Sequence, residues 1–89
     1  MSDIKKPAAK INLYPVSAII WRNPTPKGVF YAVTFERSYR DDSGQWQTSS
    51  NFNQQELLLL AKAADQAESE IRRLRAEDRS SDQAEDEAA

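Results

Sequence analysis

The sequence predicts an α+β protein, in which an antiparallel sheet of three to four strands is followed by one long C-terminal amphipathic helix. Apolar and polar residues alternate through the first half of the chain, which is typical of strands with one buried face. An acidic turn that contains glycine interrupts this alternation, and a helical apolar period begins after residue 53. The chain has 89 residues, which leaves room for one domain.

The domain is expected to cover residues 10–76, because the composition changes on either side of it. Residues 1–9 are polar and basic, include Pro7 and show no apolar period, which is typical of a flexible N-terminal arm. Residues 77–89 are acidic and low in complexity, which predicts a disordered tail. A folded part of this size buries a modest fraction of its surface, so we expect the chain to self-associate.

Four stretches have the composition of strands, at residues 10–14, 16–22, 29–40 and 45–52. The third stretch is the clearest, because its odd-numbered apolar residues fall on one face, which we expect to point toward the core: Val29, Tyr31, Val33 and Phe35. The segments between the last three strands have the composition of turns. They are Asn23–Gly28, with two prolines and a glycine, and Asp41–Gly44, a hairpin turn that ends on glycine.

The start of the helix is well specified, because Asn53 is a favourable N-cap and Glu56 completes a capping box three residues later. The apolar residues that follow keep a helical spacing and form one stripe, made of Leu57, Leu60, Ala61, Ala64, Ala67, Ile71 and Leu74. Leu58 and Leu59 widen the stripe, which leaves two interpretations open. The helix has a broad face against a single core, or it also packs on a neighbouring subunit, with Leu58, Leu59 and Ile71 at the dimer interface.

The composition argues against an enzyme. The chain has no cysteine and no histidine, so it lacks thiolate ligands, disulfides and the commonest general base and metal ligand. Asp41 and Asp42 are adjacent carboxylates, but aspartate is ordinary in a turn that contains glycine. We therefore expect no catalytic residues, no metal and no cofactor. No apolar run is long enough to span a bilayer, so we expect no membrane contact and a cytoplasmic or nucleoid-associated location.

The net charge of −2 hides a strong asymmetry along the chain. The first forty residues hold seven basic and two acidic residues, whereas residues 76–89 hold one arginine and six acidic residues. A basic region attached to an acidic arm indicates nucleic-acid binding, although both ends could also serve only solubility. The predicted β-strands carry both cationic and aromatic side chains. In proteins that bind single-stranded nucleic acid, cations neutralise the phosphates and aromatic rings stack on the bases.

Six residues are the candidates for such binding: Arg22, Lys27, Arg37, Tyr39, Arg40 and Trp46. We expect Tyr39 and Trp46 to be exposed, because they flank the hairpin beyond the densest apolar part of the strands. Tyr31 shares a face with three apolar residues, so we expect it in the core. Trp21 and Phe30 fit the core and the surface equally well.

The order of these elements resembles the transcriptional coactivator family called positive cofactor four, which shares a fold with the plant Whirly proteins. The resemblance covers about residues 10–74. It is carried by the strand end Phe35-Glu-Arg-Ser-Tyr39, the hairpin Asp42-Ser-Gly44, the polar return strand and the helix segment Ile71-Arg-Arg-Leu74. It implies a homodimer that binds single-stranded DNA through curved sheets, with helices in the dimer contact and Arg37, Tyr39, Arg40 and Trp46 on the binding ridges.

The match departs from the family in the return strand, which is basic in the family but holds no Lys or Arg in residues 45–53 of this chain. The acidic end also looks like the tails with which single-strand binding proteins recruit partner proteins. We therefore expect a dimeric single-stranded DNA-binding protein that acts in replication, recombination or transcription. The alternative is a protein-interaction adaptor without nucleic-acid binding, whose helix or edge strand recruits a partner.

Overall fold

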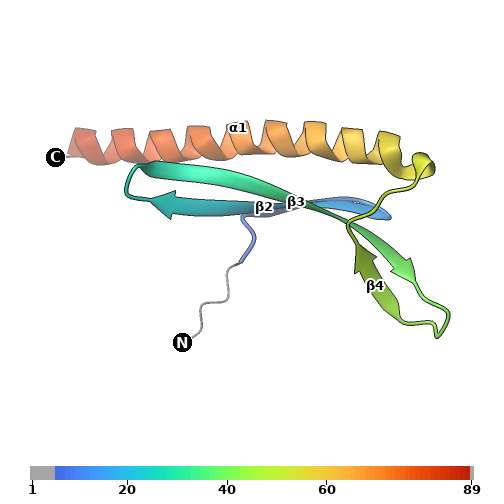
Figure 1. The fold of residues 1–89 in the computed structure, drawn as a ribbon. Helices are drawn as coiled ribbons and strands as arrows, with labels where there is room; N and C mark the ends of the chain where they lie inside the picture. The colour runs from blue at the N-terminus through green and yellow to red at the C-terminus, as the bar shows by residue number, and fades with distance from the viewer. Residues whose placement is uncertain (1–5, 89) are drawn as a thin grey trace, which may run out of the picture.

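The computed structural model describes residues 6–88, with side chains described as far as Arg79. Four strands come first, β1 (Ala9–Leu13), β2 (Val16–Thr25), β3 (Gly28–Arg40) and β4 (Trp46–Ser49). A single 3₁₀ turn, η1 (Gln54–Glu56), leads into the helix α1 (Leu57–Ala88). The predicted α+β class with one C-terminal helix is therefore confirmed (Figure 1).

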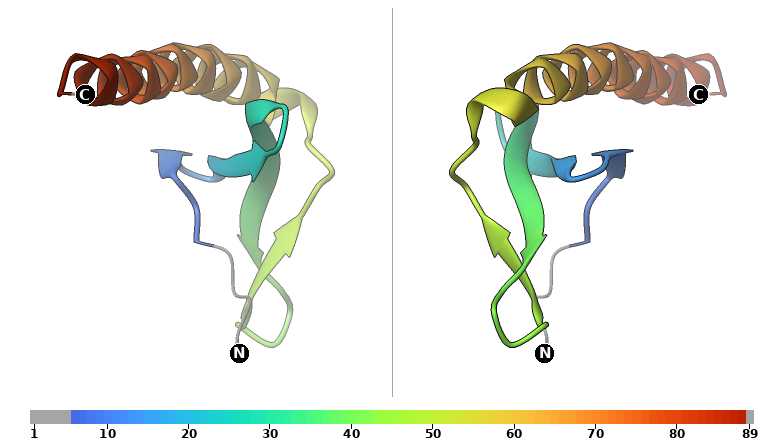
Figure 2. Two further views of the ribbon diagram at one scale, coloured as in Figure 1. Left: turned by 90° about the vertical axis from the view of Figure 1, so that its left-hand side faces the viewer. Right: turned by 90° about the vertical axis from the view of Figure 1, so that its right-hand side faces the viewer.

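The strands form one antiparallel meander in the order β1-β2-β3-β4. The long strand β3 pairs with β2 through its first ten residues and with β4 only at its end, where Arg40 lies opposite Trp46. The end of β3 and β4 swing away from α1, and the helix covers only one face of the sheet (Figures 1 and 2). We call the other face the open face.

The turns follow the sequence closely, with one difference. The hairpin between β3 and β4 closes as predicted, because the amide of Gly44 donates to the carbonyl of Asp41 at 2.9 Å and Gly44 has a φ of 85°. The predicted turn at residues 23–28 is shorter, since β2 continues to Thr25, which pairs with Gly28 of β3. Pro24 is tolerated within β2 because β1 pairs with β2 only as far as Ile20, so β2 is an edge strand at this position.

The core lies between the middle of β2 and the middle of α1. Its buried residues are Val16, Ala18 and Ile20 on β2 and Ala63 and Ala67 on α1. The predicted inward face of β3 is confirmed, because Tyr31, Val33 and Phe35 pack against this cluster. Successive residues of a strand point to opposite faces, so the even-numbered residues of β3 point to the open face.

The predicted stripe on the helix is partly wrong. Leu60, Ala67, Ile71 and Leu74 do face the sheet, but Leu57, Ala61 and Ala64 are exposed. Ala63 takes their place and is completely buried against the sheet. Residues three and four apart lie on the same side of a helix, so alanines at 61, 63, 64 and 67 allowed two stripes. Packing against β2 selects between them.

Both ends of the domain differ from the expected boundaries. Ala9 already belongs to β1, and the Ala8 amide donates to the carbonyl of Ile20 at 2.7 Å. Residues 1–5 of the predicted arm lie outside the described residues. At the other end the helix continues to Ala88, where a disordered tail was predicted from residue 77, and Asp78 is bonded to both β2 and β3. No helix in the described part of the chain is long and apolar enough to cross a membrane.

Candidate nucleic-acid interface

The most exposed aromatic residues gather where β3 meets β4. Trp46 opens β4 with 58% of its surface exposed, and Tyr14, in the turn between β1 and β2, is 71% exposed. Their rings meet edge to face, with centroids 6.2 Å apart. The guanidinium carbon of Arg40 lies 5.6 Å from the centroid of the Trp46 ring, a cation–π contact. We call Tyr14, Arg40 and Trp46 the β4 platform.

The hairpin turn holds Arg40 in place. Its Nε and Nη2 atoms both donate to the carbonyl of Gly44, at 3.3 and 3.2 Å. The carboxylate of Asp41 fixes the turn itself, since it accepts bonds from Ser43, Gln45 and Gln47. The hydroxyl of Ser43 is the main cause that lowers the pKa of Asp41 to about 2. A rigid turn therefore supports the exposed ring and its cation.

Arg37 and Tyr39 lie on the other side of the strand end. Arg40 and Trp46 share one face, so the preceding odd-numbered residues of β3 point to the opposite one. The Nε atom of Arg37 donates to the carbonyl of Asn51 at 2.8 Å and lies 3.7 Å from the Glu56 carboxylate. Its guanidinium carbon also lies 5.2 Å from the centroid of the Tyr39 ring. Arg37 thus ties the loop before α1 to the sheet.

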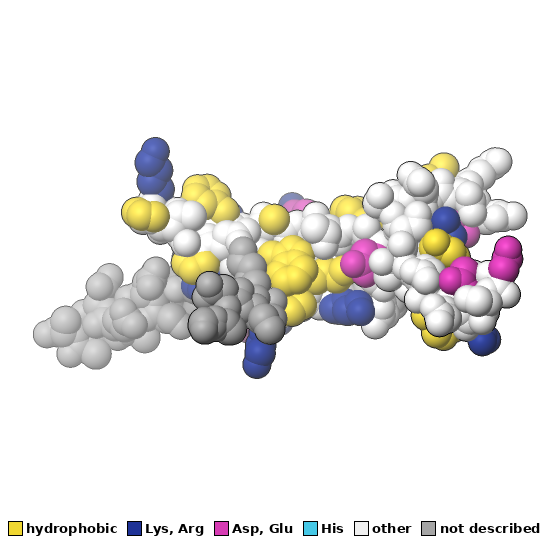
Figure 3. Space-filling view, turned by 60° about the horizontal axis from the view of Figure 1, so that its bottom comes forward, with side chains coloured by type: hydrophobic (Ala, Val, Ile, Leu, Met, Phe, Trp, Pro, Cys, Tyr) yellow, Lys and Arg dark blue, Asp and Glu magenta, His cyan; other side chains and the backbone are white. Residues whose placement is uncertain are grey.

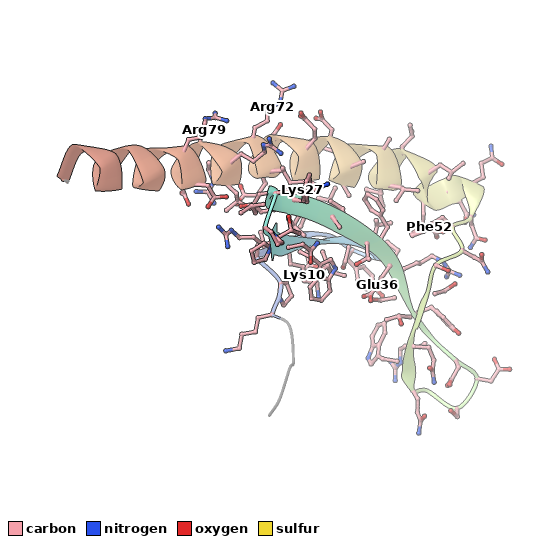
Figure 4. All side chains as sticks on the ribbon, turned by 60° about the vertical axis from the view of Figure 1, so that its left-hand side comes forward. Lys10, Lys27, Glu36, Phe52, Arg72 and Arg79 are labelled. Carbon is pink, nitrogen blue, oxygen red and sulfur yellow. The ribbon has the colours of Figure 1, made fainter. Side chains whose placement is uncertain are left out.

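Arg22 and Lys27 lie at the far end of the sheet, near the turn between β2 and β3. Arg22 pairs with Asp78 of α1 at 3.2 Å, and the Tyr31 hydroxyl donates to the second oxygen of Asp78 at 2.6 Å. The bond from Tyr31 is the main cause that lowers the pKa of Asp78. Lys27 is exposed in the turn, where Figure 4 shows it close to the helix. A cavity of about 270 Å³ lies between this turn and α1, lined by Gly28, Val29, Arg75, Asp78 and Arg79.

The six predicted residues therefore do not form one surface. The structure brings Arg40 and Trp46 together, places Arg37 and Tyr39 behind them, and leaves Arg22 and Lys27 at the other end of the sheet. Leu58 is 84% exposed at the start of α1, whereas Leu59 and Ile71 are half-buried and pack against the chain's own core.

Sequence reasoning omitted three aromatic residues of the open face from the candidate site. Phe30 is 55% exposed, and the half-buried Trp21 donates its indole N–H to the hydroxyl of Thr34 at 3.0 Å. The alternation along β3 already separates Phe30 from the core face, so the signal for it was present. Nothing in the local sequence indicates that Tyr14 meets Trp46, because the two residues come together only through the pairing of the strands.

Hydrophobic side chains gather in the middle of the open face and lysines and arginines lie around them (Figure 3). Four of the eight aromatic residues belong to this face: Tyr14, Trp21, Phe30 and Trp46. The register also places Lys10 there, opposite Ile19. Among the described residues, no three acidic side chains lie close enough together to hold a metal ion.

Comparison with protein-family models, with curated proteins and with solved structures finds no match to this chain. The resemblance to positive cofactor four therefore stays a prediction.

Proposed function

We propose that the chain is a single-stranded nucleic-acid-binding protein that uses the open face of its sheet, and not an enzyme. The observation that carries the proposal is the β4 platform, in which an exposed indole ring lies beneath a guanidinium group and beside a second exposed ring. An exposed ring offers a base a stacking surface, and an adjacent arginine can contact the phosphate of the same nucleotide.

The ligand we propose is single-stranded, because an exposed ring can stack only on a base whose own face is free. The bases of a duplex are stacked on one another, so their faces are hidden from the platform. The resemblance noted in the sequence makes single-stranded DNA the form to test first. Roles in replication, recombination or transcription, and a cytoplasmic or nucleoid location, belong to the same proposal.

The electrostatic contribution is expected to be modest. Arg22 and Arg37 point to the helix-covered face, where they pair with Asp78 and Glu56, so the described cations of the open face are chiefly Lys10 and Arg40. Each neutralised phosphate of a single strand contributes about −0.7 to the slope of log K against log salt. With two or three phosphate contacts the slope should lie between about −1.4 and −2.

Replacing Trp46 with alanine is the direct test. Stacking on an aromatic side chain contributes about 1–3 kcal/mol per base, so Trp46→Ala should weaken oligonucleotide binding about 5- to 150-fold. Tyr39→Ala is the matched control, because this ring is also exposed but points away from the platform. Quenching of tryptophan fluorescence measures binding to wild type and control, and anisotropy of a labelled oligonucleotide measures it for all three proteins.

The result that would overturn the proposal is equally direct. If the wild-type protein binds no single-stranded oligonucleotide at low salt, or binds a duplex of the same length equally well, the open face does not serve this function. If Tyr39→Ala and Trp46→Ala weaken binding equally, the β4 platform is not the site.

The exposed start of α1 favours a second candidate, a protein-interaction role. Leu57 and Leu58 are 50% and 84% exposed, and a helix that presents adjacent leucines to water is suited to contact with another protein surface. A second copy of the chain is the partner we propose, which makes a homodimer compatible with nucleic-acid binding. If the chain is only a protein-interaction adaptor, it should still self-associate through Leu57 and Leu58 but should bind no oligonucleotide.

A further inference from the structure

The exposed rings of the open face form two groups. The β4 platform is one, and Trp21 with Phe30 is the other, which we call the hairpin platform. Trp21 lies opposite Ala32 and Phe30 lies opposite Asn23, so the two rings occupy neighbouring positions on β2 and β3. The bond from the Trp21 indole to Thr34 holds one ring against the sheet, while Phe30 is 55% exposed beside it.

Between the two platforms, the residues of β2 that point to the open face have little exposed surface. Ser17 and Ile19 of β2 point to this face but are each only 7% exposed. The Ser17 hydroxyl donates to the Asn12 side chain at 2.7 Å, so its polar group is already satisfied. The stretch of β2 from Ser17 to Ile19 therefore offers no exposed aromatic ring on which a base could stack, and the rings available for stacking lie on either side of it.

The register gives the separation of the platforms. Ala32, the partner of Trp21, and Arg40, the partner of Trp46, are eight residues apart along β3. At about 3.3 Å per residue this corresponds to roughly 26 Å along the strand. Stacked nucleotides rise about 3.4 Å each along one strand, so about eight of them cover this distance, and fewer if the strand is extended.

Glu36 lies at the midpoint of this path, four residues from Ala32 and four from Arg40 along β3. It points to the open face opposite Ser17 and forms no ion pair with any residue between 6 and 79. Figure 4 shows Glu36 on β3, in the stretch that leads toward the β4 end. A carboxylate here opposes the phosphates of a strand that crosses the face, but not those of a ligand held at one end.

We propose that the ligand is a single strand long enough to reach both platforms at once, about eight nucleotides when stacked, and that Glu36 weakens its binding by repulsion. This inference rests on the proposed function. It adds a minimum length of the oligonucleotide that reaches both platforms, and it names Glu36 as a residue that lowers the affinity for such an oligonucleotide. Shorter strands occupy the β4 platform alone, because that platform has its own cation in Arg40.

A length series tests the two-platform site in the full chain. Oligothymidylates from about four to about sixteen nucleotides cover the known range of site sizes for single-strand binding folds. The affinity should rise by at least about tenfold between the shortest strands and those of about eight to ten nucleotides, and then level off. A steady rise with length and no step would overturn the inference.

Two variants separate the platforms. Phe30→Ala should remove the rise in affinity with length. The affinity for long oligonucleotides should fall about 5- to 150-fold, and the affinity for the shortest should not change. Glu36→Gln should tighten the binding of long strands several-fold and leave short strands unchanged. Asp65→Asn is the matched control for charge, because Asp65 is an exposed residue of α1 that also forms no ion pair with the described residues, and α1 covers the other face of the sheet.

The possible failures are distinguishable. If no strand of any length binds, the proposed function fails. Suppose that oligonucleotides bind and that Trp46→Ala weakens their binding, but that Phe30→Ala and Glu36→Gln leave the affinity unchanged at every length. The proposed function at the β4 platform then stands, and the two-platform inference is wrong.

Discussion

At the scale of single residues, Asp41 shows how one carboxylate organises the hairpin turn between β3 and β4. It accepts bonds from the Ser43 amide and hydroxyl, at 2.9 and 2.7 Å, from the Gln45 amide at 3.0 Å and from the Gln47 side chain at 3.1 Å. These bonds stabilise the ionised form, which is why the pKa of Asp41 falls to about 2. The turn that carries Arg40 and precedes Trp46 is therefore sensitive to acid.

The titration of Asp41 is a testable consequence. The folded pKa lies below the ordinary value of 3.8, so the stabilisation is fully present above pH 3.8 and is lost as the pH falls through about 2. NMR titration of the Asp41 carboxyl carbon should give a pKa near 2. Asp41→Ala should lower the Tm at pH 7, whereas Asp42→Ala at the exposed neighbouring position should leave it unchanged. Equal Tm values for the two variants would contradict this role.

At the scale of elements, the contact of α1 with the sheet depends on two small residues. Ala63 and Ala67 are completely or almost completely buried against Val16, Ala18 and Ile20 of β2. Alanine brings the helix axis close to the strands, and close packing leaves no room for a larger side chain. The Arg22–Asp78–Tyr31 cluster fastens the same helix further along, where the hairpin between β2 and β3 meets it.

Replacing Ala63 with leucine should therefore lower the free energy of unfolding. Overpacking of a close contact destabilises a fold by about 1–3 kcal/mol, whereas Ala64→Leu at an exposed position should change the free energy of unfolding by less than about 0.5 kcal/mol. Urea denaturation of both variants, followed by circular dichroism, measures the difference. If Ala64→Leu destabilises the fold and Ala63→Leu does not, the stripe of α1 that faces the sheet is the one predicted from sequence.

At the scale of the whole molecule, a small core is combined with an exposed apolar patch. Few hydrophobic residues between 6 and 79 are fully or nearly buried, whereas Leu57 and Leu58 together present a broad apolar surface at the start of α1. A domain with so modest a core gains stability when a second copy covers such a patch. Because this patch belongs to the helix and the platforms lie on the open face, a dimer would leave both platforms accessible.

Self-association is open to direct measurement. Light scattering coupled to size-exclusion chromatography should give about twice the chain mass of 10.1 kDa for the wild type. Leu58→Glu should return the mass to that of one chain, because a charge would then be buried in the apolar contact. Ser69→Glu, at an exposed site about three turns along α1, should stay dimeric. A wild-type protein with the mass of one chain would rule out this interface.

Much of the fold could be predicted from the sequence, because the relevant signals are local. The inward face of β3 follows from a period of two, and the hairpin at Asp41–Gly44 follows from its turn residues. The capping box forms as expected, with the Asn53 amide donating to the Glu56 carboxylate at 2.8 Å. The alternation along β3 also places Arg37 and Tyr39 on the face opposite to that of Arg40. The prediction from composition had put all three residues on one binding surface.

By itself, then, the sequence determined the strands, the main turns and the start of the helix, because each depends on residues only a few positions apart. Only the tertiary structure decided which alanines of α1 face the sheet, since residues three and four apart fit a helical stripe equally well. It also decided that Tyr14 meets Trp46 and that Asp78 binds Arg22 and Tyr31. Such contacts join residues 32 to 56 positions apart, and no local period encodes them.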